Sequence, residues 1–224
     1  MGEASAEPHW VAWHRYYDDP NSALPRRLAF VQRRLRDALD AAPSGEIRLL
    51  SMCAGQGRDV LGVLPDHPRR DDVRARLVEL EPTLAADAER AARAAGLDGV
   101  EVVRADAGTT DAYASLAPVA VALVCGVFGN ITDDDIRRTA EELPGLCAPG
   151  ATVIWTRHRR EPDRTPAVRS YFTEGGFTEV AFDVEDGHTM SVGTYRLTGE
   201  ARPYQPGVRM FTFVGDGGQS GLRG

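Results

Sequence analysis

The chain has 224 residues, enough for one domain with a sizeable core, and no apolar run in it approaches the ~20 residues that a membrane-spanning helix needs. All 26 basic residues are arginines, so enzymes that form a Schiff base on a lysine, such as pyridoxal-phosphate enzymes and lysine aldolases, are excluded. The net charge of -7 argues against nonspecific nucleic-acid binding, which requires a basic face.

The remaining composition narrows the class of protein further. Three scattered cysteines lack the spacing of a zinc or disulfide framework, and no histidine–carboxylate cluster suggests a metal site. Abundant alanine, glycine, proline and arginine suggest a GC-rich bacterial genome. The segment from Met1 to Glu7 resembles neither a signal nor a transit peptide, so we expect a cytoplasmic protein.

A helical extension, residues 1–45, precedes the first predicted strand. Apolar residues recur at helical spacing from Leu24 to Leu39, with Asn21 or Ser22 as the cap. An aromatic stripe lies before this helix; it is typical of a packing surface, and the alternative is a lid that closes an active site and excludes water. The stripe consists of Trp10, Trp13, Tyr16 and Tyr17.

Short apolar runs alternate with helical segments through the middle of the chain. The predicted strands cover residues 47–52, 74–80, 100–106, 119–125 and 151–157, and the predicted helices cover 58–64, 82–95, a segment capped by Thr132 and a segment that begins at Thr165 and is closed by Gly175-Gly176.

The last third of the chain has a different pattern. Residues 177–184 and 209–214 are each typical of a strand, with no clear helix between them, which indicates an antiparallel end to the sheet. The connector 188–207 is irregular and could fold over a substrate, and the tail 215–224 is glycine-rich and expected to be flexible.

These elements predict one α/β domain over residues 1–224 with a Rossmann-like, doubly wound sheet. The sheet is expected to be mostly parallel, with an antiparallel final strand and helices on both faces in three αβα layers. The core is expected to span residues 46–214 behind the N-terminal extension.

Two glycines follow the first predicted strand, and an acidic residue ends each of the next two strands. Gly55 and Gly57 admit a close backbone approach to a ligand, as in dinucleotide-binding sheets. Glu79 ends the second strand, where an acid can accept hydrogen bonds from ribose hydroxyls. Asp106 ends the third strand, where an acid can accept a hydrogen bond from the exocyclic amine of adenine. Together they predict an adenosine site at one edge of the sheet.

This arrangement resembles the class I S-adenosylmethionine-dependent methyltransferases, from about Ile47 onward. The family usually has an acid at the position of Ser51 and a glycine at that of Cys53, and Asp59 could substitute for the missing acid. The resemblance implies that S-adenosyl-L-methionine is the cofactor and that it is held by Ser51, Cys53, Ala54, Gly55, Gly57, Asp59, Glu79, Leu80, Asp106, Ala107 and Gly126.

The methyl acceptor would lie beside the fourth and fifth strands. Asn130 could orient an acceptor or end a turn, and Arg157 to Arg160 form either a solvated charge run or a site for an anionic substrate. The candidates for catalysis are His14, Tyr17, Asn130 and His158. The candidates for substrate contact are Tyr16, Phe128, Arg157 and Arg159.

We therefore expect methyl transfer to oxygen, nitrogen or carbon of a small molecule, by a monomer or homodimer without metal, membrane or nucleic-acid partners. One alternative is a non-catalytic module that binds S-adenosylmethionine, which the departures at Ser51 and Cys53 keep open. The other is an NAD-dependent oxidoreductase, in which Asp106 and the antiparallel end would have no role.

Overall fold

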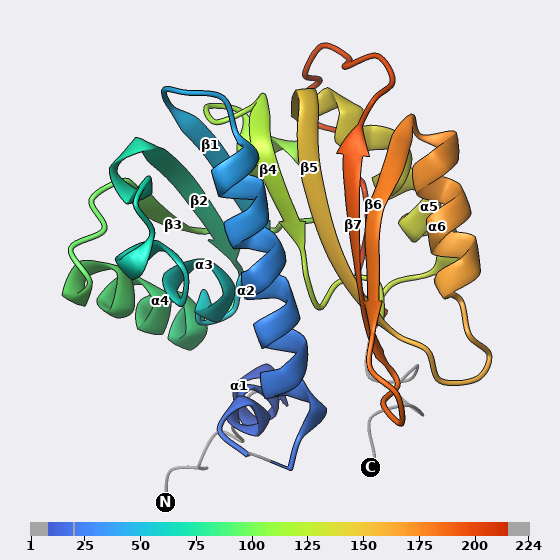
Figure 1. Cartoon of the computed structure of the whole chain (residues 1–224), viewed down its shortest axis with the longest axis horizontal. Helices are drawn as coiled ribbons and strands as arrows, with labels where there is room; N and C mark the ends of the chain where they lie inside the picture. Colours follow the sequence, from blue (N-terminus) through green and yellow to red (C-terminus); the bar gives the residue numbers. More distant parts are fainter. Residues whose placement is uncertain (1–8, 20, 215–224) are drawn as a thin grey trace, which may run out of the picture.

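Helices and strands alternate along most of the chain in the computed structural model, which describes residues 9–19 and 21–214 (Figure 1). The helices are α1 (His9–His14), α2 (Ala23–Ala41), α3 (Arg58–Leu61), α4 (Pro82–Ala94), α5 (Asp133–Glu142) and α6 (Thr165–Glu174), with short 3-10 helices that include η1 (Arg15–Tyr17) and η4 (Thr110–Tyr113). The strands are β1 (Ile47–Met52), β2 (Val73–Glu79), β3 (Val100–Arg104), β4 (Val119–Val124), β5 (Cys147–His158), β6 (Phe177–Val184) and β7 (Met190–Leu197).

The strands form one seven-stranded sheet in the order β3-β2-β1-β4-β5-β7-β6. The pairs from β3 to β5 are all parallel, whereas β7 runs antiparallel to both of its neighbours. Strand order reverses between β1 and β4, and in open α/β sheets ligands bind outside the carboxyl ends of the strands at such a reversal. The predicted doubly wound sheet with an antiparallel final strand is confirmed.

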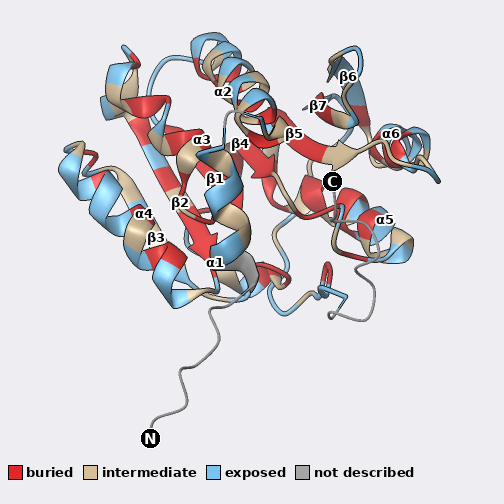
Figure 2. Ribbon diagram, turned by 90° about the horizontal axis from the view of Figure 1, so that it is seen from below, coloured by how far each residue is buried: buried red, intermediate tan, exposed pale blue. Residues whose placement is uncertain are grey.

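Two apolar cores separate the sheet from its helical layers. On one face, Val31 and Leu35 of α2 and Val60 of α3 pack with apolar residues of β1, β2 and β4. On the other face, α5 and α6 contribute Ile136 and Phe172 to the larger core. Figure 2 shows the sheet between these layers, with buried residues along the strands and exposed residues on the outer faces of the helices. The predicted αβα layering is confirmed.

The N-terminal extension is helical, as the sequence predicts. The Ser22 hydroxyl accepts a hydrogen bond from the Leu24 amide at 3.1 Å and so caps α2. Residues 1–8, the side chain of Trp10 and the predicted tail 215–224 lie outside the described residues.

The assignment of the last strand is wrong, because β7 covers Met190–Leu197 and residues 209–214 do not join the sheet. Gly193 interrupts the apolar pattern of β7, so the sequence pattern does not predict this strand. A Cβ at Gly193 would lie 2.3 Å from a ring carbon of Trp155, so the indole fills the space of the absent side chain. Met210 and Phe211 instead enter the core from a loop, which explains their strand-like apolar pattern.

The helix predicted after the glycine loop is shorter than expected. The sequence predicts a helix over residues 58–64, whereas α3 ends at Leu61, just before Gly62. The crossover from β3 to β4 uses η4 alone and places no α-helix there. Among the described residues, no helix combines the length and apolar character needed to cross a bilayer.

Candidate functional site

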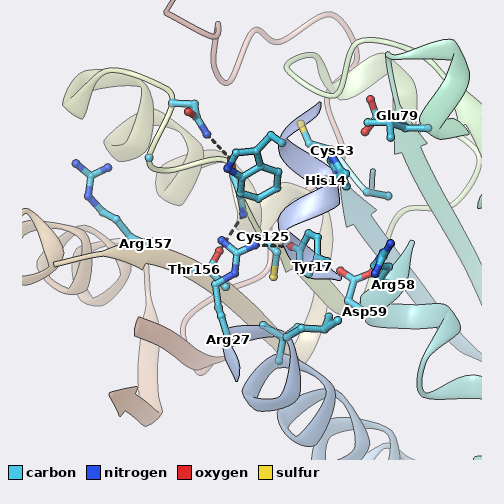
Figure 3. A pocket seen from close by; sticks show the side chains of 18 of the residues that line it. His14, Tyr17, Arg27, Cys53, Arg58, Asp59, Glu79, Cys125, Thr156 and Arg157 are labelled. Carbon is cyan, nitrogen blue, oxygen red and sulfur yellow. Dashed lines mark hydrogen bonds between the residues drawn. The ribbon is translucent and has the colours of Figure 1, made fainter. Parts of the chain in front are cut away.

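A cavity of about 660 Å³ opens at the carboxyl ends of β1, β2, β4 and β5, beside the reversal of strand order. Its volume lies within the range of small-molecule and cofactor sites. α2 and the N-terminal segment with η1 cover it from one side, and residues 213–214 contribute to its wall. In Figure 3, Glu79 and Arg157 lie at opposite ends of this cavity, with Arg27 and Thr156 between them.

The glycine loop holds its left-handed conformations at three positions. Gly55 and Gly57 have φ of 56° and 67°, and Cys53 has φ of 52°. A non-glycine residue is disfavoured at such an angle, which explains why a glycine at the position of Cys53 would be easier to accommodate. Gly57 caps α3 and packs against Leu77; it does not line the cavity, whereas Cys53 does.

Glu79 is oriented by backbone donors before any ligand binds. Its two carboxylate oxygens accept hydrogen bonds from the amides of Gly55 and Glu81, each at 2.7 Å. Burial raises the pKa of the Glu79 carboxyl, and these backbone hydrogen bonds oppose the rise. The next residue, Leu80, exposes 63% of its surface and lines the cavity, so it offers an apolar face beside the acid.

Asp106 follows β3 and lines the same end of the cavity as Glu79. One carboxylate oxygen accepts a hydrogen bond from the Gly108 amide at 2.8 Å, and the other accepts one from Arg209 at 2.6 Å. Ala107 is buried beside it and also lines the cavity. Thus the two acids expected to contact an adenosine do lie at one cavity.

Two buried side chains of opposite charge, Asp59 and Arg27, lie at the middle of the cavity. Both side chains line it and are less than a tenth exposed. Asp59 accepts a hydrogen bond from the Val60 amide at 2.8 Å and a long one from the Ser51 hydroxyl at 3.4 Å. Burial raises the pKa of the Asp59 carboxyl, and the charge of Arg27 is among the groups that oppose this rise. Ser51 itself lies beneath Asp59 and does not line the cavity.

The N-terminal aromatic residues pack against Arg27 and Arg58. Arg27 donates a hydrogen bond to the Tyr17 hydroxyl, and its guanidinium lies 5.6 Å from the ring centroid of Trp13. Arg58 makes two hydrogen bonds to Asp18, at 2.7 and 3.1 Å, and its guanidinium lies 5.4 Å from the Tyr17 ring. Contacts with Arg27 and Arg58 therefore hold the N-terminal segment over the cavity (Figure 3).

The same segment brings His14 against the glycine loop. A Cβ at Gly55 would lie 2.1 Å from Nε2 of His14, so the imidazole occupies the space that the glycine leaves open. Trp13, His14 and Tyr17 all line the cavity. The prediction for Tyr16 is wrong, because this side chain is 56% exposed and does not line the cavity; the short turn of η1 directs it outward.

The loop after β4 forms the floor between the two ends. Gly126 lines the cavity, and a Cβ there would meet no atom within 4 Å. Asn130 lines the cavity and also ends the turn, because its amide group donates to the Gly126 carbonyl at 2.7 Å. Phe128 was expected to contact substrate, and this is wrong: it is fully buried and packs on Trp155 and Phe172 in the core.

The end of β5 supplies the basic part of the cavity. Arg157, His158 and Arg160 line it, whereas Arg159, which follows the end of β5, does not; the prediction that Arg159 contacts the substrate is therefore wrong. Among the described residues, Nε and Nη1 of Arg157 and Nδ1 of His158 are buried and have no hydrogen-bond partner. Burial lowers the pKa of both groups, and the charges of Arg157 and Arg160 lower that of His158 further.

Two cysteines also line the cavity, but neither is suited to nucleophilic chemistry. Burial raises the pKa of the thiols of Cys53 and Cys125, so both remain protonated at neutral pH. In the part of the chain that the structure describes, no group of histidine, cysteine and acidic side chains is placed to hold a metal ion.

Sequence reasoning missed several residues of this cavity. Arg27 lies within an amphipathic helix, where an arginine is ordinarily on the solvent face, and Trp13 was noted only as part of a stripe. Met190 belongs to the strand that the pattern hid. The other lining residues without a predicted role include Leu28, Val31, Gln56, Glu81, Leu84, Thr156, Glu161, Phe213 and Val214.

Solved structures with this fold include several methyltransferases. Magnesium protoporphyrin IX methyltransferase from Synechocystis, solved with bound S-adenosylmethionine, is 10% identical and superposes with a TM-score of 0.64 over 87% of this chain and 99% of its own. The CurJ carbon methyltransferase is 15% identical, with a TM-score of 0.63 over 84% of this chain and 58% of its own. A possible exported protein from Bordetella parapertussis is 16% identical, with a TM-score of 0.65 over 86% and 80%. At these identities the likeness shows a shared fold.

The sequence comparison adds the family. No curated protein matches the chain. The family described as "Putative methyltransferase" matches residues 24–169, from α2 through the glycine loop and both acids to α6. Since this match covers well over half of the sequence, the chain belongs to that methyltransferase family.

Proposed function

We propose that this protein transfers the methyl group of S-adenosylmethionine to a small-molecule acceptor that carries an anionic group. The observation that carries the proposal is one cavity in which two preoriented acids, two buried side chains of opposite charge and a basic strand end follow one another across the sheet. These groups correspond in order to an adenosine, an amino-acid zwitterion and an anionic acceptor.

The adenosine end is formed by Glu79 and Asp106. Carboxylates held by other donors keep free lone pairs, so Glu79 can accept from ribose hydroxyls and Asp106 from the adenine amine. The exposed Leu80 would lie against the base. The glycine loop lines this end of the cavity through Cys53 and Ala54, which would lie beside the chain between ribose and sulfur.

Asp59 and Arg27 match the charges at the other end of the cofactor. An α-amino acid carries an ammonium and a carboxylate, and Asp59 and Arg27 present the complementary charges inside the cavity. Arg27 can bind a carboxylate in bidentate fashion. Asp59 would then take the place of the acid that the family usually has at Ser51.

The bound cofactor supplies an electrophilic methyl on a sulfonium. The protein aligns the acceptor and excludes water, which the aromatic cover of Trp13 and Tyr17 favours. His158 is suited to remove a proton from the acceptor, because its lowered pKa keeps the imidazole neutral near pH 7. The unpartnered nitrogens of Arg157 can bind the anionic group of the acceptor.

The antiparallel β7 disfavours the alternative oxidoreductase, whose dinucleotide-binding sheet continues with parallel strands. The non-catalytic alternative predicts binding without turnover, so it differs from the proposal in whether any acceptor is methylated.

The experiment that tests the role of Arg27 compares two ligands by calorimetry. S-adenosylhomocysteine has the amino-acid end and 5′-methylthioadenosine lacks it. Arg27→Met should weaken binding of S-adenosylhomocysteine by about tenfold or more, because a charge-assisted pair is lost. It should change binding of 5′-methylthioadenosine by less than about twofold.

Arg33→Met is the matched control, since this guanidinium is half-exposed on the same helix and pairs with Asp183 away from the cavity. It should alter neither affinity. Equal weakening of both ligands by Arg27→Met would mean that Arg27 shapes the cavity and does not bind the carboxylate.

A further inference from the structure

The segment that follows β7, residues 202–214, crosses the two loops that form the cavity. We refer to it as the strap. It pairs with the loop after β3, where Met210 donates to the Gly108 carbonyl at 2.8 Å and Thr110 donates to the Val208 carbonyl at 3.0 Å. It then reaches the loop after β4, where the Val214 amide donates to the Asn130 carbonyl at 2.9 Å.

The strap is fixed by burial as well as by hydrogen bonds. Met210 and Phe211 are at most 1% exposed and belong to the same core as Trp155. The Phe211 carbonyl lies so close to Gly108 that a Cβ there would be 2.3 Å away. The backbone on either side of Arg209 and Phe213 therefore has a defined position relative to the cavity.

Arg209 is the strap residue that reaches the predicted adenine contact. Its guanidinium donates to one oxygen of Asp106 at 2.6 Å, while the Gly108 amide holds the other oxygen at 2.8 Å. Both side chains of this ion pair are about half-exposed, with 48% for Arg209 and 50% for Asp106. Such a pair contributes little to stability, but it fixes the rotamer of the carboxylate.

The strap continues from Asp106 along the cavity wall. Phe213 and Val214 both line the cavity, and each still exposes more than a third of its surface. Phe213 packs edge-on against the buried Phe211, with ring centroids 5.8 Å apart. The strap thus joins the acid at the adenosine end to the wall near Asn130.

We propose that Arg209 is a positioning residue for recognition of the nucleobase, and that the strap makes adenine selectivity a property of this segment. The inference rests on the proposed function, because it requires an adenosine beside Asp106. Arg209 and Gly108 orient the carboxylate so that its remaining lone pairs face the cavity and accept a hydrogen bond from the exocyclic amine. A base with a carbonyl at that position would place its oxygen, which only accepts hydrogen bonds, against the Asp106 carboxylate. Such a base would bind more weakly.

The test measures affinity for S-adenosylhomocysteine and for S-inosylhomocysteine, which has a carbonyl in place of the amine. The unaltered protein should prefer the adenosyl ligand by about tenfold or more. Arg209→Ala should lower this preference several-fold, and Arg209→Lys should restore part of it. The melting temperature should change little, because the ion pair is half-exposed.

A double-mutant cycle separates positioning from a general effect on the fold. If Arg209 acts through Asp106, Arg209→Ala should change neither affinity further when Asp106→Ala is already present. Arg202→Ala is the matched control, because this arginine lies on the same strap but pairs with Glu142. It should leave the preference intact.

The outcomes distinguish the inference from the function on which it rests. If the unaltered protein binds neither ligand, the proposed function fails. If it binds the adenosyl ligand selectively and Arg209→Ala keeps the same preference, or weakens both ligands equally, the role of Arg209 is wrong.

Discussion

The two ends of the cavity differ in charge and in how their polar groups are satisfied. At the end near β2 and β3, Glu79 and Asp106 have each carboxylate oxygen hydrogen-bonded by the protein. At the end of β5, buried nitrogens of Arg157 and His158 have no partner among the described residues. Preoriented acids suit one fixed ligand, whereas buried donors without partners require that the ligand supply the acceptors.

This difference explains why the cofactor can be inferred from the chain more sharply than the acceptor. Loops of the fold fix the orientation of Glu79 and Asp106, so these acids indicate which ligand groups they would bind. The basic end indicates only that the acceptor carries a negative charge and where that charge would lie. The three predictions below test this contrast in order of expected effect.

The largest effect is expected for Glu79→Ala. It would remove the proposed ribose contact, and it leaves the amides of Gly55 and Glu81 without their acceptor. Calorimetry should show at least about tenfold weaker binding of both S-adenosylhomocysteine and 5′-methylthioadenosine, because both contain the ribose. Glu101→Ala, on the neighbouring strand and paired with Arg76, should bind both normally. Unchanged affinity in Glu79→Ala would remove this residue from the ribose site.

A smaller and selective effect is expected for Arg157→Met. The Kd of S-adenosylhomocysteine should stay within about twofold, since the change lies at the opposite end of the cavity. For an acceptor found by screening carboxylates and phosphate esters against matched neutral amides, KM should rise by about tenfold. Arg104→Met, at the exposed last residue of β3, is the control. Equal KM values with and without Arg157 would contradict an anion site there.

The smallest effect concerns the pH dependence of His158. Its pKa lies below the ordinary value of 6.5, because burial and the charges of Arg157 and Arg160 disfavour the imidazolium. The neutral base is therefore present at neutral pH and is lost only as the pH falls through the lowered pKa. Removing the charge in Arg157→Met should raise this pKa and move the acidic limb of kcat to higher pH. Histidine titration by NMR measures the shift, and a pKa at or above 6.5 in the unaltered protein would contradict this assignment.

The parallel half of the fold could be predicted because its signals are local and periodic. The apolar strand 47–52, the cap at Ser22 and the cap at Thr132 each determine structure within a few residues. The final strand could not be predicted in the same way. Gly193 is a strand residue only because Trp155, distant in sequence, packs over it.

The candidate site shows the same division. Glu79 ends β2 and Asp106 follows β3, so the topology of the sheet brings them to one edge whatever side chains surround them. The proposed roles of Arg27 and Arg209 depend on tertiary structure that no sequence spacing encodes: Arg27 is buried at the cavity, and Arg209 contacts Asp106. Phe128 was misplaced for a related reason: a loop beside the cavity still directs one aromatic ring into the core.

The central claim is that the cavity binds S-adenosylmethionine, and the most direct measurement is calorimetric titration of the purified chain with S-adenosylhomocysteine, with NADH titrated in parallel. We predict micromolar binding of S-adenosylhomocysteine and none of NADH. Binding of NADH alone, or of neither ligand, would contradict it.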